Sequence, residues 1–250
     1  MTMLYHATNL SIENSRNMEI HYGSFTFNKN MLTIIQGKSG IGKTSLLRVL
    51  GLLCWNIAHD SEITLYRDGN GPGDSLTSLD WKKAQELRQA HFGYILQDDH
   101  LVDSIYVRDN ILFPSLLTVA NIDTITKTLD RYLELPFLNP IKNKMDESCA
   151  TLSGGEKKKV ALLRAILKDP QILVADEPWT NMGGNQHEGD VKDFTDFFIQ
   201  QRKHKSTILA THDEEVIQKY KQYDYVEAFE LTEIEEASQI KKIRVIPVTQ

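Results

Sequence analysis

Residues Gly37 to Thr44 fit the pattern G-x-x-x-x-G-K-[ST], in which a glycine-rich turn holds phosphate groups. Residues 31–36 read as a strand before this turn, and residues 44–53 read as a helix after it. Backbone N–H groups of such a turn converge on phosphate oxygens, and the helix N-terminus adds partial positive charge. Lys43 adds a full positive charge, and the Thr44 hydroxyl can bind Mg²⁺. A glycine-rich turn that binds nothing is the alternative, but it would not need the strand and helix in these places. The predicted phosphate-binding residues are Gly37, Ser39, Gly40, Gly42, Lys43, Thr44 and Ser45.

Two carboxylates follow a second apolar run. Residues 172–175 read Ile-Leu-Val-Ala, as in a buried parallel strand, and Asp176 and Glu177 come directly after them. Ligands of open α/β sheets bind at the carboxyl ends of the strands. Asp176 can therefore hold Mg²⁺, and Glu177 can orient or deprotonate the water that attacks a phosphate. An acidic helix start would be the better interpretation of an isolated Asp-Glu pair. Because this chain also has a phosphate-binding loop, we prefer the roles in Mg²⁺ binding and water activation for Asp176 and Glu177.

A third segment, Leu152 to Glu156, reads Leu-Ser-Gly-Gly-Glu before a predicted helix that ends at Leu167. Ser153, Gly154 and Gly155 would present a hydroxyl and free N–H groups to an anion at the start of this helix. A simple capping box would account for Ser153 but not for two adjacent glycines.

The order of apolar patterns predicts an α/β fold with a parallel sheet. Residues 5–27 alternate apolar and polar positions, as antiparallel strands do. Residues 108–167 have helical patterns, with breaks expected near three prolines, Pro114, Pro136 and Pro140. Strands return at residues 172–175 and 207–210, around an amphipathic stretch at 191–202, which is the pattern of a βαβ unit. A helical lobe is therefore expected to interrupt an α/β core.

Composition excludes several classes of function. The chain has 250 residues and a formal net charge of −6, which argues against a basic nucleic-acid-binding surface. Cys54 and Cys149 lack the spacing of a zinc site or a disulfide framework, which fits a reducing cytoplasm. The chain begins without a basic region followed by an apolar one, and its densest apolar run, residues 49–55, is too short to span a bilayer. Membrane association is expected to come from a partner.

In combination, these motifs resemble the nucleotide-binding subunit of an ATP-binding cassette (ABC) transporter, and the match runs from about Leu32 to His212. The resemblance implies one ABC ATPase domain over residues 1–250, with a P-loop NTPase core, an N-terminal antiparallel β subdomain and an inserted α-helical subdomain. Residues 1–97 and 168–250 would form the core and β subdomain, and residues 98–167 the helical subdomain.

The resemblance also assigns roles to individual residues. In this family the segment around Ser153 caps the γ-phosphate of ATP held by the partner's P-loop, so a homodimer is implied. Gln97 matches the glutamine that senses Mg²⁺ and the attacking water, and His212 matches the histidine that contacts the γ-phosphate. The implied catalytic residues are Gln97, Glu177 and His212, and the implied Mg²⁺ ligands are Thr44, Gln97 and Asp176.

Within the family, residues 87–97 are similar to the lipoprotein-releasing and macrolide-exporter subfamily. That similarity implies a separate integral membrane permease, which holds the chain at the cytoplasmic face of a bacterial inner membrane. The cargo would be a lipoprotein, a protein or peptide, or a lipophilic compound. Leu101, Ile105 and Tyr106 are candidate contacts for the permease, with ordinary core positions as the alternative. A soluble ABC ATPase that does no transport and a regulatory subunit with weak hydrolysis are the alternative functions.

The chain departs from the family pattern at several positions. Gly183 replaces the usual aspartate of the loop after Glu177, which puts coupling between two ATP sites in doubt. Lys158 stands in the predicted helix after residues 152–156, at a position where the family usually has glutamine. The usual aromatic residue that stacks on adenine is missing from residues 11–19, and Tyr5 and Tyr22 are the possible substitutes.

Overall fold

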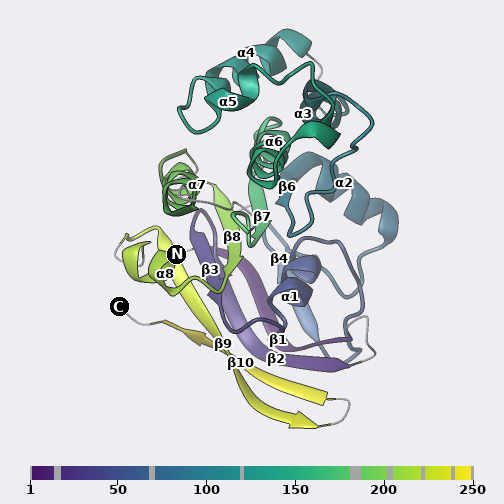
Figure 1. Cartoon of the computed structure of the whole chain (residues 1–250). Coiled ribbons are helices and arrows are strands. Elements are labelled where there is room, and N and C mark those ends of the chain that lie inside the picture. The colour runs from purple at the N-terminus through teal and green to yellow at the C-terminus, as the bar shows by residue number, and fades with distance from the viewer. Residues whose placement is uncertain are drawn as a thin grey trace. The chain divides into compact units, whose positions relative to one another are not determined.

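The computed structural model describes residues 2–13, 18–67, 71–118, 121–180, 187–201, 205–220, 223–237 and 240–248. The chain forms two compact units (Figure 1). The first unit combines Met1–Arg88 with Gln201–Gln250, and the second is Gln89–Gln200. The predicted subdomain boundaries at residues 97 and 167 remain predictions.

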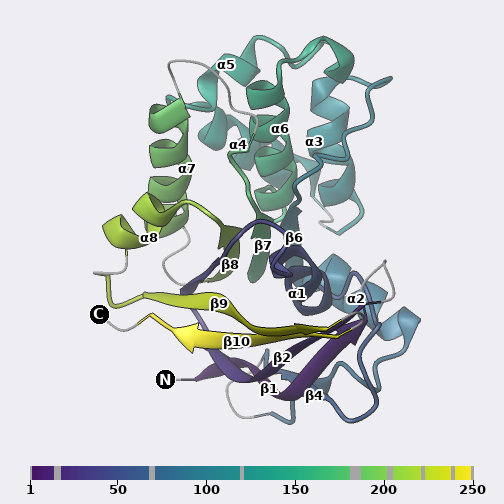
Figure 2. The same cartoon turned by 60° about the horizontal axis from the view of Figure 1, so that its bottom comes forward.

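The first unit is built on a mixed sheet (Figure 2). Its strands lie side by side in the order β5 (Asp74–Ser75), β4 (Glu62–Leu65), β1 (Met3–Glu13), β2 (Glu19–Asn28), β10 (Ile240–Pro247), β9 (Val226–Ala237), β3 (Leu32–Gln36) and β8 (Ser206–Thr211). β1 is antiparallel to β2 and β4, as the alternating pattern predicts. β3 is parallel to β8 and β9, and both β3 and β8 are almost wholly buried. Two helices of this unit are α1 (Lys43–Leu50) and α8 (Glu214–Tyr220).

The second unit combines two parallel strands with helices. β6 (Phe92–Ile95) pairs with β7 (Ile172–Asp176), and Ile95 lies opposite Ala175. The helices are α3 (Val107–Leu116), α4 (Ile122–Leu133), α5 (Asn139–Lys142), α6 (Gly154–Ile166) and α7 (His187–Gln201), with a 3₁₀ turn at Cys149–Thr151. α2 (Trp81–His91) leads from the first unit into the second.

An aromatic cluster fixes α7 to the α4–α5 region. Phe194 and Phe197 of α7 lie 5.6 and 6.1 Å from the ring of Phe137, and Tyr132 of α4 lies 6.1 Å from Phe197. Tilted and edge-on pairs of this kind add to the stability that area burial gives. Because the apolar positions of α7 repeat with helical spacing, they reach this cluster from one side of the helix.

The helix that contains Pro114 ends close to this proline, as predicted. Pro114 lies inside α3, and the helix ends two residues later at Leu116. A proline cannot donate to the carbonyl of the preceding turn and crowds it, which favours an early end of the helix. Pro140 sits in the first turn of α5, where a missing N–H costs nothing.

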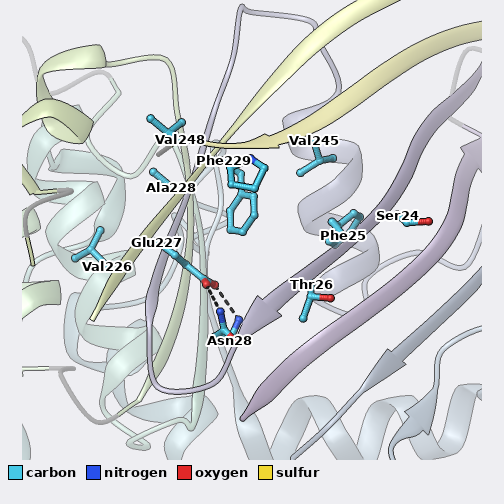
Figure 3. Close-up of a pocket in the computed structure, with 11 residues that line it drawn as sticks. Ser24, Phe25, Thr26, Asn28, Val226, Glu227, Ala228, Phe229, Val245 and Val248 are labelled. Atoms are coloured by element: carbon cyan, nitrogen blue, oxygen red, sulfur yellow. Dashed lines mark hydrogen bonds between the residues drawn. The ribbon is translucent and has the colours of Figure 1, made fainter. Parts of the chain in front are cut away.

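A pocket of about 480 Å³ opens in the first unit between β2 and the β9–β10 hairpin (Figure 3). Phe25 and Phe229 line it together with Glu227. The Glu227 carboxylate accepts hydrogen bonds from the backbone N–H and side-chain amide of Asn28 at 2.9 and 2.7 Å, and from Thr33 at 2.7 Å. Burial raises the pKa of Glu227 in spite of these bonds. The Glu227 carboxylate therefore links β2 to β9 in a part of the sheet where β10 no longer pairs with β2.

Within the described ranges, no helix combines the length and the apolar character that crossing a membrane requires.

We expect Gly93→Ala to lower the free energy of unfolding by about 2 kcal/mol, because β6 passes close to the end of α6. A Cβ at Gly93 would lie 2.5 Å from the carbonyl oxygen of Ala165 and 2.8 Å from Cγ of Pro170. Urea unfolding followed by circular dichroism measures the change. Gly71→Ala is the control, since no atom lies within 4 Å of its Cβ position; equal stability of both variants would contradict the prediction.

Candidate nucleotide site

The glycine-rich loop leaves β3 and enters α1 through backbone that favours glycine. Gly40 and Gly42 have φ angles of +77° and +122°, which side chains rarely allow. Lys43 is buried, and its ammonium donates hydrogen bonds to the carbonyl oxygens of Gly37 at 2.7 Å and Lys38 at 3.3 Å. The Lys43 ammonium group therefore lies within the loop, where it is predicted to bind phosphate.

Tyr22 supports this loop from β2. Its hydroxyl donates a 2.7 Å hydrogen bond to the carbonyl oxygen of Gly42, and burial raises the tyrosine pKa so that the donor keeps its proton. Tyr22 is 1% exposed. Tyr5 is also fully buried and donates to the Leu50 carbonyl. Both tyrosines are core residues here, so neither offers a ring face for adenine to stack on.

Asp176 is the last residue of β7, and Glu177 follows it directly. Asp176 and Glu177 are 2% and 8% exposed. Glu177 has a φ of +45°, a left-handed conformation that costs a non-glycine residue on the order of 1 kcal/mol. The Glu177 carbonyl accepts a 3.0 Å bond from the N–H of Thr180, so a tight turn holds this conformation. Residue types around Glu177 do not indicate this backbone strain.

The segment at Ser153 begins α6 with a full capping box. The Ser153 N–H and hydroxyl both donate to the Glu156 carboxylate at 2.9 Å, and the Ser153 oxygen accepts from the Glu156 N–H at 3.4 Å. Lys144 lies 2.8 Å from the same carboxylate. Burial alone would raise the pKa of Glu156, but the bonds from Lys144 and Ser153 bring it below its usual value. The capping box accounts for Ser153, and Gly154 remains exposed beside it.

Parallel pairing brings predicted residues to common sheet edges within each unit. In the first unit Gln36 of β3 lies opposite Thr211 of β8. The phosphate-binding loop and His212 therefore leave the sheet at the same edge. In the second unit the β6–β7 register likewise sends Gln97 and the pair Asp176–Glu177 out at one edge. The structure describes the predicted site residues; Gly183 lies outside the described residues.

Known proteins resemble this chain in sequence and in fold. The family model described as "ABC transporter" matches residues 20–180. The lipoprotein-releasing system ATP-binding protein LolD of Neorickettsia sennetsu is 30% identical over 84% of this chain and 83% of its own length. The macrolide export ATP-binding/permease protein MacB of Chlorobium phaeobacteroides is 28% identical over 77% of this chain and 27% of its own. The dimeric MJ0796 cassette bound to ADP and Pi has a TM-score of 0.69 at 19% identity, covering 91% of this chain and 94% of that chain.

The fold and the match to the family model define a P-loop ATPase of the cassette type. The chain belongs to the ABC transporter family. It is the type of subunit that binds and hydrolyses ATP. The predicted likeness to the lipoprotein-releasing and macrolide-exporter subfamily is confirmed, as is the predicted α/β fold.

We expect Gly42→Ala to abolish nucleotide binding without unfolding the chain. A Cβ there would lie 2.6 Å from the Tyr22 hydroxyl, on backbone with φ +122°. Binding of a fluorescent ATP analogue measures the loss. Adding Tyr22→Phe removes the closest contact but not the backbone strain, so the double variant should recover only part of the affinity. Wild-type affinity in Gly42→Ala would show the prediction wrong.

The Glu156 carboxylate predicts a pH dependence of stability. Its native pKa is below the usual 4.5, so its contribution is complete above that value and is lost as pH falls through the lower native pKa. Glu156→Gln can keep the capping geometry but cannot titrate. Unfolding midpoints measured from pH 6 down to about pH 3 should fall more steeply for the wild type than for Glu156→Gln. Parallel curves would argue against the assignment.

Proposed function

We propose that two copies of this chain hydrolyse ATP to drive a separate membrane permease at the cytoplasmic face of a bacterial inner membrane. The proposed cargo is a lipoprotein, a protein or peptide, or a lipophilic compound, in line with the names of the relatives LolD and MacB. The proposal depends on one observation: β6 and β7 are parallel, so Gln97, Asp176 and Glu177 follow them at the same edge of the sheet. No nucleic acid is expected as a partner, because the chain is acidic.

In the proposed site, backbone N–H groups of residues 37–45 and the Lys43 ammonium bind the triphosphate. Glu177 would orient a water molecule whose oxygen attacks the γ-phosphorus, while the bond to the β-phosphate oxygen breaks. The products are ADP and inorganic phosphate. Glu177 has a strained, left-handed backbone, a feature that is often found at functional sites and fits a positioning role.

Magnesium fits the oxygen ligands that these positions offer. Thr44, Gln97 and Asp176 supply a hydroxyl, an amide and a carboxylate, the hard donors that Mg²⁺ prefers. The described residues contain no group of three or more His, Cys, Asp or Glu that could hold a metal alone. That composition suits an ion that shares its ligands with nucleotide phosphates, whose charge it would neutralise.

The second copy would complete each site with its own Ser153 segment. Ser153 and Gly154 are exposed at the start of α6, so N–H groups at this end can meet a phosphate from another chain. Lys144 balances the charge of Glu156 beside them. His212 is also exposed, at the end of β8, and is proposed to contact the γ-phosphate.

The permease is proposed to dock near the start of α3. Tyr106 is 49% exposed and Val102 is 52% exposed, while Leu101 and Ile105 are half-buried. The guanidinium of Arg108 lies 5.2 Å from the centre of the Tyr106 ring. An apolar surface with an adjacent cation is suited to a helix of mixed character from another protein.

We expect Glu177→Gln to bind Mg-ATP and form a stable dimer, because the chain can close on ATP but cannot activate water. Size-exclusion chromatography with light scattering, with and without Mg-ATP, measures the state. Lys43→Ala should stay monomeric and unbound. Chelation of Mg²⁺ by EDTA should abolish hydrolysis in the wild type. A monomeric Glu177→Gln chain at saturating Mg-ATP would refute the proposed cycle.

Affinity purification of the Glu177→Gln chain from host membranes in detergent, with Mg-ATP present, tests the transport role. We expect mass spectrometry to identify a polytopic permease with a large extracytoplasmic domain. Recovery of soluble or DNA-associated proteins alone would favour the non-transport alternative. Hydrolysis at least a hundredfold below that of typical enzymes, with normal ATP binding, would favour the regulatory alternative.

A further inference from the structure

The ammonium group of Lys158 is enclosed where α6 meets the loop that follows β6. The Lys158 side chain is 1% exposed. Its Nζ donates to the carbonyl oxygens of Gln97 at 2.7 Å and Leu96 at 3.2 Å, and lies 2.9 Å from a carboxylate oxygen of Asp99. The three acceptors match the three N–H donors of an ammonium group. All four residues belong to the second unit, in which α6 and β6 lie side by side (Figure 1).

A second cation of α6 holds the next part of the same loop. Arg164 donates to the carbonyl oxygens of Asp99 at 2.5 Å and His100 at 2.8 Å. Residues 96–100 are therefore attached to α6 through their backbone, not only through side chains. Backbone carbonyls cannot rotate away as side chains can, so these contacts fix the path of the loop.

We propose that Lys158 is a positioning residue that makes Gln97 move together with the Ser153 end of α6. The inference rests on the proposed catalytic role of Gln97. Lys158 is five residues from Ser153, or about 7.5 Å along the helix axis at the usual rise. Because an α-helix is stiff over that length, any displacement of the Ser153 segment carries the Gln97 backbone with it.

The charge of Lys158 distinguishes this attachment from one made by a neutral amide. A glutamine at this position could donate to carbonyl oxygens but would not neutralise the Asp99 carboxylate, whose side chain is 17% exposed. Removing one partner of a buried ion pair leaves an uncompensated charge, which is much more costly than losing a surface pair. Lys158 and Asp99 are therefore expected to act as a unit.

Hydrogen–deuterium exchange of the whole chain tests the attachment. In Lys158→Met we expect exchange of the backbone amides of residues 97–101 to rise about tenfold, while exchange in α4 and α7 stays as in the wild type. The same variant should lose about tenfold in kcat and change KM for ATP less than twofold, because the phosphate-binding loop is untouched. Lys142→Met is the matched control: its 2.6 Å pair with Glu134 is exposed on the surface, and neither readout should move.

A charge-neutral pair of substitutions provides the second variant. Lys158→Gln with Asp99→Asn removes both charges together, so we expect it to fold and to recover at least half of the kcat that Lys158→Met loses. Asp99→Asn alone should behave like Lys158→Met. A double variant no better than either single variant would overturn the proposal.

Three further outcomes would also count against the proposal, and they separate its failure from failure of the proposed catalytic role of Gln97. Loop exchange unchanged in Lys158→Met would overturn the positioning role alone. Exchange raised throughout the second unit would show that Lys158 only stabilises the fold. Wild-type hydrolysis in Gln97→Ala would overturn the catalytic role of Gln97, and the positioning role with it.

Discussion

The register of the parallel strands is the constraint on which the rest of the structure depends. Hydrogen bonding between β3 and β8 fixes Gln36 opposite Thr211, and bonding between β6 and β7 fixes Ile95 opposite Ala175. A slip of one residue would turn every side chain of these buried strands to the other face. Because such a slip would expose apolar side chains, packing enforces the register and thereby sets where each functional loop begins.

Backbone strain lies where β7 ends. Glu177 has left-handed backbone directly after β7, and Asp176 is buried beside it. The left-handed backbone opposes folding, so the apolar packing of β7 must offset its cost. The backbone at Gly42 is also constrained, because its carbonyl oxygen accepts a hydrogen bond from the Tyr22 hydroxyl. An enzyme that must position phosphate and water can use such rigidity, because catalysis of phosphoryl transfer depends mainly on positioning and charge.

The loop after β6 is controlled by α6 rather than by its own side chains. Lys158 and Arg164 hold four consecutive or near-consecutive backbone carbonyls, those of residues 96, 97, 99 and 100. The same helix begins with the capping box of Ser153. Two elements proposed to meet nucleotide, one in the chain's own site and one in the partner's, therefore share one rigid support. In this chain the support includes a buried ion pair at Lys158, where the family resemblance led us to expect glutamine.

The sequence alone determined the order of the elements, the phosphate-binding loop and the family, because glycine spacing and apolar periodicity are local properties. It also indicated β7 and its two carboxylates. It also predicted a helix break near Pro114, and α3 ends two residues beyond that proline. Tyr5 and Tyr22 could be judged only in three dimensions, since an aromatic residue in a strand has the same local pattern whether it is buried or faces a ligand. The partners of Lys158 lie about sixty residues away in the sequence, so only tertiary packing decided what that lysine does.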